Sequence, residues 1–108
     1  MHNLLYTKNK KMKKLSKSQQ EEFFLILKRE DKKLDEIFLK IKLVKKEFFS
    51  TFELAASYYN DMKHFLDKKE YVKAFELQNY IWGILDSLAI MKAIEVPKDL
   101  QKHFKAEF

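Results

Sequence analysis

The chain has 108 residues, a formal net charge of +6, one glycine, one proline and no cysteine. This length suits one domain with its own core, and so few glycines and prolines leave little for the tight turns of a strand-rich fold. Disulfides, thiolate nucleophiles and cysteine-ligated metal sites are excluded.

Residues 1–17 form a basic segment that holds the whole charge excess. It contains six lysines and no acid, whereas residues 18–108 hold sixteen basic and sixteen acidic residues. Clustered lysines contact phosphates without reading sequence, which makes this segment the candidate for nucleic-acid binding through Lys8, Lys10, Lys11, Lys13, Lys14 and Lys17. A solvated, flexible tail is the simpler interpretation, because blocks of like charge are commonly disordered.

No segment of the sequence is predicted to enter a membrane. The longest uninterrupted apolar run, Phe23 to Leu27, is far shorter than a membrane span, and no signal-peptide core follows the lysines. We therefore expect a cytoplasmic protein with no membrane partner.

A long first helix is predicted from Ser18 to about Glu47. Ser18 and Glu21 have the spacing of a capping box, in which two side chains bond the first free backbone amides. From Phe23 to Phe48, positions three or four apart are apolar with one exception, which predicts one continuous face against partner helices. At 1.5 Å per residue, such a helix would be roughly 45 Å long and overhang its neighbours.

Two shorter helices are predicted to follow, joined by a tight corner at Lys68 and Lys69. Capping patterns at Ser50 to Glu53 and Asp67 to Glu70 place the starts of these helices, and the second of them extends to Met91. Whether the first and second helices are separated by a loop or a kink is left open.

The C-terminal segment, residues 97–108, begins with the proline and is predicted to form one short helix. Leu100 and Phe104 lie four residues apart, on one helical face. Since short connections make successive helices antiparallel neighbours, the sequence predicts an all-α fold, an up-down-up antiparallel three-helix bundle over residues 18–96.

The predicted helical hairpin contains a glycine and an aspartate among apolar residues, and both are unusual at such positions. In an antiparallel hairpin with this corner, residues whose numbers sum to about 137 lie at one level. Gly83 then lies opposite Ala55, which suggests a close approach of the two helices. Asp86 lies near Ser50 to Phe52, where a carboxylate would stabilise the positive end of the second helix.

The same level argument places Asp61 beside Glu76, with His64 one turn away. Two carboxylates and an imidazole can bind a divalent metal, but bundle metal sites usually use Glu-x-x-His pairs, which this chain lacks. A hydrogen-bonded polar edge is therefore the preferred interpretation over a metal site. No catalytic motif is present, so we expect no enzyme and no cofactor.

The second and third helices resemble an archaeal family catalogued as domain of unknown function 357. The resemblance covers about residues 52–90 and differs from the family pattern at Ile81, Ile84 and Lys92. It implies a helical bundle and an archaeal cytoplasmic source, with no known activity. The matching residues are Tyr59, Asp61, Phe65, Tyr71, Ala74, Phe75, Tyr80, Gly83, Leu85 and Asp86.

Two adjacent aromatic pairs, Phe23-Phe24 and Phe48-Phe49, point to a partner surface. Neighbours on a helix point about 100° apart, so one ring of each pair can face the bundle and the other a partner. Our leading hypothesis is a non-enzymatic protein-interaction module, a scaffold or adaptor that self-associates through the first helix, as a homodimer for example, or binds another protein. The alternative is a nucleic-acid-binding accessory protein that uses the basic segment.

Overall fold

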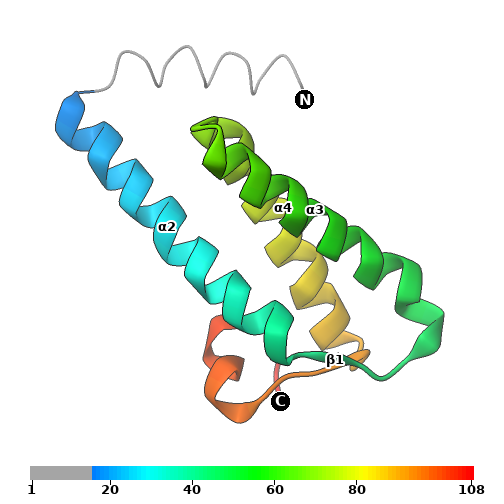
Figure 1. Ribbon diagram of the computed structural model, residues 1–108. Coiled ribbons are helices and arrows are strands. Elements are labelled where there is room, and N and C mark those ends of the chain that lie inside the picture. The colour runs from blue at the N-terminus through cyan, green and yellow to red at the C-terminus, as the bar shows by residue number, and fades with distance from the viewer. Residues whose placement is uncertain (1–15) are drawn as a thin grey trace.

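The computed structural model describes residues 16–108 (Figure 1), so the lysines from Lys8 to Lys14 lie outside the described residues. Three helices, α2 (Lys17–Lys40), α3 (Phe49–Asp67) and α4 (Tyr71–Ile90), run in alternating directions and pack together. This arrangement confirms the predicted three-helix bundle. None of the helices between residues 16 and 108 has both the length and the hydrophobicity of a membrane span.

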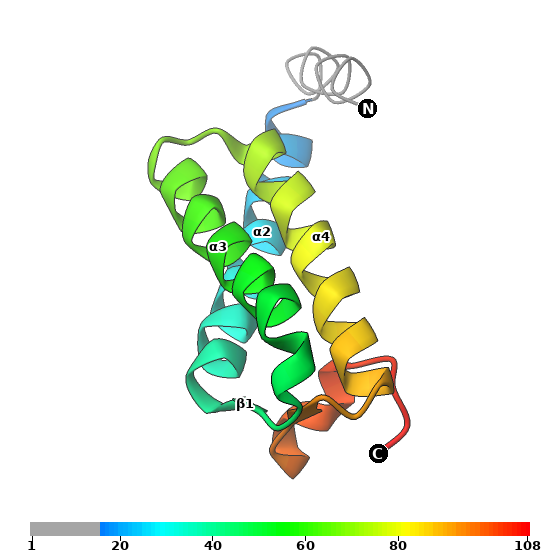
Figure 2. The ribbon, with the colours of Figure 1, turned by 90° about the vertical axis from the view of Figure 1, so that its right-hand side faces the viewer.

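Helices α3 and α4 form an antiparallel hairpin, and Figure 2 shows them side by side in front of α2. The corner lies at Lys68 and Lys69, as predicted, but the predicted Asp67-to-Glu70 cap is wrong because no side chain caps α4. The amides of Lys69 and Glu70 bond instead to the carbonyls of Leu66 and Phe65, at 3.0 and 2.9 Å. Lys69 adopts a left-handed φ of 61°, which ends α3 by the common C-terminal motif.

The first helix begins two residues earlier than predicted. Ser16 accepts a hydrogen bond from the amide of Gln19 at 3.2 Å, and its own amide donates to the Gln19 side chain at 2.9 Å. Ser16 and Gln19 thus form the capping box expected at Ser18 and Glu21. Both pairs have the required spacing, and the earlier one adds half a turn to the helix.

The first helix also ends earlier than predicted, at Lys40 rather than near Glu47. The chain then forms a short ribbon in which β1 (Lys42–Leu43) pairs antiparallel with β2 (Ile94–Glu95), followed by the 3-10 helix η1 (Lys46–Phe48). The first and second helices are therefore separated by a loop, not a kink. The α2 length is roughly 36 Å at 1.5 Å per residue, so the predicted overhang is much reduced.

The start of α3 is another correction. Helix α3 begins at Phe49, and its N-cap residue Phe48 makes no side-chain capping bond, so the pattern at Ser50 to Glu53 does not cap it. The C-terminal prediction is confirmed in substance: the 3-10 helix η2 (Lys98–His103) follows the proline. Leu100 and Phe104 are both buried, which ties this segment to the bundle.

The core lies where α2 covers one side of the hairpin. Gln78 donates from Nε2 to the carbonyl of Leu27 at 2.9 Å, which fixes α4 against α2 in the interior. Burying apolar side chains of this size stabilises a fold by about 1.5–3 kcal/mol each. The largest fully buried side chains are Leu27, Leu34, Ile37, Met62, Ile81, Leu85, Leu88 and Gln78.

Candidate interaction surface

A polar cluster joins α2 to the hairpin on the covered side. Lys63 on α3 lies 2.8 Å from the buried carboxylate of Asp31 and 3.1 Å from that of Asp35. The Tyr59 hydroxyl donates a hydrogen bond to Asp35, and its ring stacks on Phe38 with centroids 4.6 Å apart. The helical pattern of apolar residues did not predict the buried Asp31, whose only sequence signal is the i, i+4 spacing to Asp35.

The cluster changes the ionisation of its members. Burial would raise the pKa of Asp35, but hydrogen bonds from Tyr59 and Lys63 hold this pKa below its usual range. Burial, with the hydrogen bond to Asp35, raises the pKa of Tyr59 to about 12. Burial would lower the pKa of Lys63, but both carboxylates raise it well above its ordinary value. At neutral pH, Asp35 is therefore negatively charged, Lys63 is positively charged and Tyr59 keeps its proton, which are the states that these contacts require.

Tyr59→Phe is expected to cost about 0.5–1.5 kcal/mol of unfolding free energy at neutral pH, because it removes one hydrogen bond to Asp35. Since folding raises the pKa of Tyr59, this difference from wild type is fully present below the ordinary tyrosine pKa of 10.0 and is lost as the pH rises toward about 12. Folding lowers the pKa of Asp35, so the contribution of this carboxylate disappears as the pH falls below 3.8. Urea unfolding of wild type and Tyr59→Phe over a range of pH measures this difference in unfolding free energy. A difference that persists unchanged in strong alkali would contradict the role given to the Tyr59 hydroxyl.

The residues considered for a metal site do not form one. Among residues 16–108, no three histidine, aspartate or glutamate side chains come together in a way that could hold a metal ion. Asp61 and His64 are exposed, and the His64 ring lies 5.8 Å from the Phe65 ring. Asp61, His64 and Glu76 therefore give no support to metal chemistry.

Two structural predictions for the hairpin are wrong. Gly83 is exposed, and a Cβ added there would meet nothing within 4 Å, so it does not allow a close approach to Ala55. Ala55 itself is fully buried. Asp86 does not cap α3: its carboxylate accepts a hydrogen bond from the amide of Lys105 at 3.0 Å and so holds the C-terminal segment against α4.

Three of the four phenylalanines proposed for a partner surface on the first helix make contacts within the molecule. The Phe23 ring lies 5.4 Å from that of Phe75, and the Phe24 ring lies 5.2 Å from that of Tyr71. Phe48 packs against the core, whereas Phe49 is 56% exposed. The expected division into one inward and one outward ring therefore holds for Phe48 and Phe49, and Phe24, at 36% exposed, is likewise the more exposed ring of its pair. Neither pair forms a continuous apolar face on α2.

A better candidate is the side of the hairpin that faces away from α2, where Figure 2 shows no other segment of residues 16–108 lying over it. Two contacts between α3 and α4 show which residues share a level on this side: the rings of Tyr58 and Tyr80 lie 5.9 Å apart, and Lys73 Nζ lies 5.4 Å from the Phe65 ring centre. Extending these levels along both helices gives a surface of eight residues, which we call the hairpin face. Its members are Leu54, Tyr58, Asp61 and Phe65 on α3 and Lys73, Leu77, Tyr80 and Ile84 on α4.

The hairpin face is mostly apolar although solvent reaches it. Six of its eight residues are apolar or aromatic; Leu54 is 45% and Tyr80 39% exposed, and the other four are half-buried. Loss of contact with water raises the pKa of Tyr80, and the negative charge of the nearby Glu76 carboxylate raises it further. These positions repeat at helical spacing on both helices, but that spacing alone could not show that they lie on the side away from α2.

Comparisons with known proteins give a family and nothing more. The model of a family described as "Protein of unknown function (DUF357)" matches residues 27–94, a range that contains the whole hairpin face. No curated protein and no solved structure matches the chain.

Proposed function

The chain belongs to the DUF357 family of proteins of unknown function, and from the hairpin face we propose that it is a non-enzymatic protein-interaction module that self-associates. The observation that supports this is the row of half-exposed apolar side chains on the side of the hairpin opposite α2. Contiguous apolar surface of this kind marks interaction sites in small proteins. The proposed interaction surface thus lies on the hairpin and not on the first helix, where we expected it from the sequence.

The pattern along α3 favours a second copy as the occupant. If two copies pack face to face with their α3 helices antiparallel, Leu54 of each lies against Phe65 of the other, and Tyr58 lies against Asp61. The tyrosine hydroxyl then donates to a carboxylate that would otherwise be buried without a partner. Two hairpins packed in this way make a four-helix arrangement, and a symmetric interface of this type closes after two subunits.

The pattern along α4 is compatible with the same pairing. Leu77 then lies against Tyr80 of the other copy, and Lys73 lies beside Ile84, near the rim, where its amine keeps contact with water. No charge of like sign meets another across the eight positions. An interface that is mostly apolar, with its lysine at the rim, is typical of homodimers.

Self-association is tested by sedimentation velocity of the full chain over a range of concentrations. We expect the weight-average mass to rise from one chain to two as concentration increases, since the proposed interface is reversible. A monomer that persists at high micromolar concentration would contradict the proposal, whatever partner the protein has.

The basic segment supports a second candidate function, nucleic-acid binding. Its lysines lie outside the described residues except Lys17, which is exposed in the first turn of α2. Deleting residues 1–15 retains the Ser16 cap, so the bundle should still fold. If the segment contacts phosphates, binding to a single-stranded oligonucleotide weakens with added salt and disappears in this deletion. Unchanged affinity after the deletion counts against this function.

A further inference from the structure

Folding separates charges that cancel in the sequence. We call residues 39–48 and 90–108 the base, because these connecting segments gather at the end of the bundle opposite the Lys68 corner (Figure 1). The base holds eight lysines and four acidic residues, a formal charge of +4. The helical body, residues 18–38 and 49–89, holds eight basic and twelve acidic residues, a formal charge of −4. The base is therefore a positive end on a negative body.

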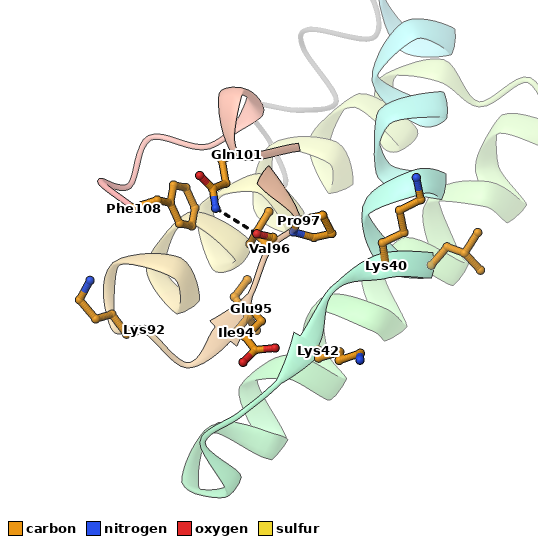
Figure 3. A pocket seen from close by; sticks show the side chains of 10 residues that line it. Lys40, Lys42, Lys92, Ile94, Glu95, Val96, Pro97, Gln101 and Phe108 are labelled. Carbon is orange, nitrogen blue, oxygen red and sulfur yellow. Dashed lines mark hydrogen bonds between the residues drawn. The ribbon is translucent and has the colours of Figure 1, made fainter. Parts of the chain in front are cut away.

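An open depression of about 800 Å³ lies in the base between the end of α2, the β1–β2 ribbon and the C-terminal segment (Figure 3). Its apolar lining includes the buried Val96, the half-buried Pro97 and the exposed side chains of Leu39 and Phe108, which are 82% and 55% exposed. The Gln101 side chain donates to the carbonyl of Val96 at 3.1 Å and so fixes part of the wall. The depression thus exposes apolar side chains to solvent.

Three lysines and one carboxylate provide the charge of the lining. Lys40 is paired with Glu36 at 3.0 Å, and Lys42 lies directly across the ribbon from Glu95. Lys92, on the α4 side, forms no ion pair with any residue between 16 and 108. The three lysines come from α2, β1 and the turn after α4, as Figure 3 shows. The depression therefore combines apolar walls with an excess of positive charge.

We propose that this depression binds an acidic peptide segment of a partner protein. Carboxylates of the segment lie at the lysines, and an apolar side chain of the segment lies in the hollow between Leu39 and Phe108. A phosphate backbone would use the lysines but not the apolar walls, and the single arginine of the chain, Arg29, lies on α2. Charge complementarity of this kind governs partner choice and association rate. The proposal does not rest on the hairpin face, which is a separate surface.

The experiment measures fluorescence anisotropy with a fluorescein-labelled peptide whose core is Glu-Leu-Glu-Phe-Glu. We expect saturable binding to the full chain at low salt. Replacing Lys42 and Lys92 together by glutamate should weaken it about tenfold, since two surface ion pairs become repulsive. Leu39→Ser should weaken it about fivefold by removing apolar contact area. Circular dichroism checks that these surface variants remain folded.

Matched controls separate the depression from the net charge of the protein. Lys32→Glu with Lys68→Glu changes the charge equally but on exposed positions of the body, and Leu25→Ser makes the same apolar change on α2. These variants should bind as wild type does. Equal weakening by the control pair, no saturation at millimolar peptide, or displacement of the peptide by a single-stranded DNA oligonucleotide would each overturn the proposal, the last in favour of a phosphate-binding surface.

Discussion

Leu34→Ala is expected to lower the free energy of unfolding by about 2–4 kcal/mol, a large share of the roughly 5–15 kcal/mol that stabilises a small domain. Leu34 is fully buried where α2 packs on the hairpin, and alanine would leave a cavity that the surrounding side chains fill only in part. Urea denaturation followed by circular dichroism measures the change.

Leu39→Ala is the matched control for this prediction, because it makes the same chemical change five residues later in the same helix. Leu39 is 82% exposed, so its loss should alter stability by less than about 0.5 kcal/mol. The difference between the two variants reports how firmly α2 is packed. Similar small effects from both would mean that α2 does not share the hairpin's core.

The arrangement of the hairpin could be predicted from the sequence because several constraints agree on it. The corner at Lys68 and Lys69 fixes which residues share a level, and the contacts between Tyr58 and Tyr80 and between Phe65 and Lys73 follow that level rule to within one residue. The short helix after Pro97 was likewise predicted, from the spacing of Leu100 and Phe104, and the structure buries both side chains. Local pattern and tertiary contact reinforce one another in these segments.

The end of the first helix could not be predicted from the same kind of pattern. Ile41 and Val44 continue the helical spacing, yet the chain leaves the helix between Lys40 and Ile41. The amide of Val44 bonds to the carbonyl of Ala93 at 2.8 Å, a partner 49 positions away in the sequence. A short apolar run fits a helix or a strand equally well, and only this distant partner decides between them.

The predictions for Asp86 and Gly83 failed for a related reason. The level rule concerned only the two helices of the hairpin, so it could not show that the C-terminal segment returns to α4 and presents the Lys105 amide to the Asp86 carboxylate. For Gly83 the rule gave the level without the direction in which the residue points, and this residue points outward. The candidate surface was obscured by the same limitation, because helical spacing alone does not say which side α2 covers.

Leu54→Glu is expected to weaken self-association at least about 100-fold, which corresponds to about 2.8 kcal/mol at about 1.4 kcal/mol per tenfold. A twofold interface contains residue 54 twice, so each substitution acts twice, each time placing a carboxylate against Phe65 of the other copy. Leu54 is 45% exposed in the single chain, and the monomer should therefore fold normally. Sedimentation velocity at matched concentrations measures the dissociation constant of both proteins.

Leu25→Glu is the control, since it adds the same charge to a position on α2 that is 66% exposed and outside the hairpin face. If both variants weaken association equally, added negative charge is responsible and the hairpin face is not the interface. If only Leu25→Glu weakens it, the interface lies on the first helix after all. Dissociation confined to Leu54→Glu, with unfolding curves unchanged at low concentration, would place the contact on α3, because fold stability and association then respond to different surfaces.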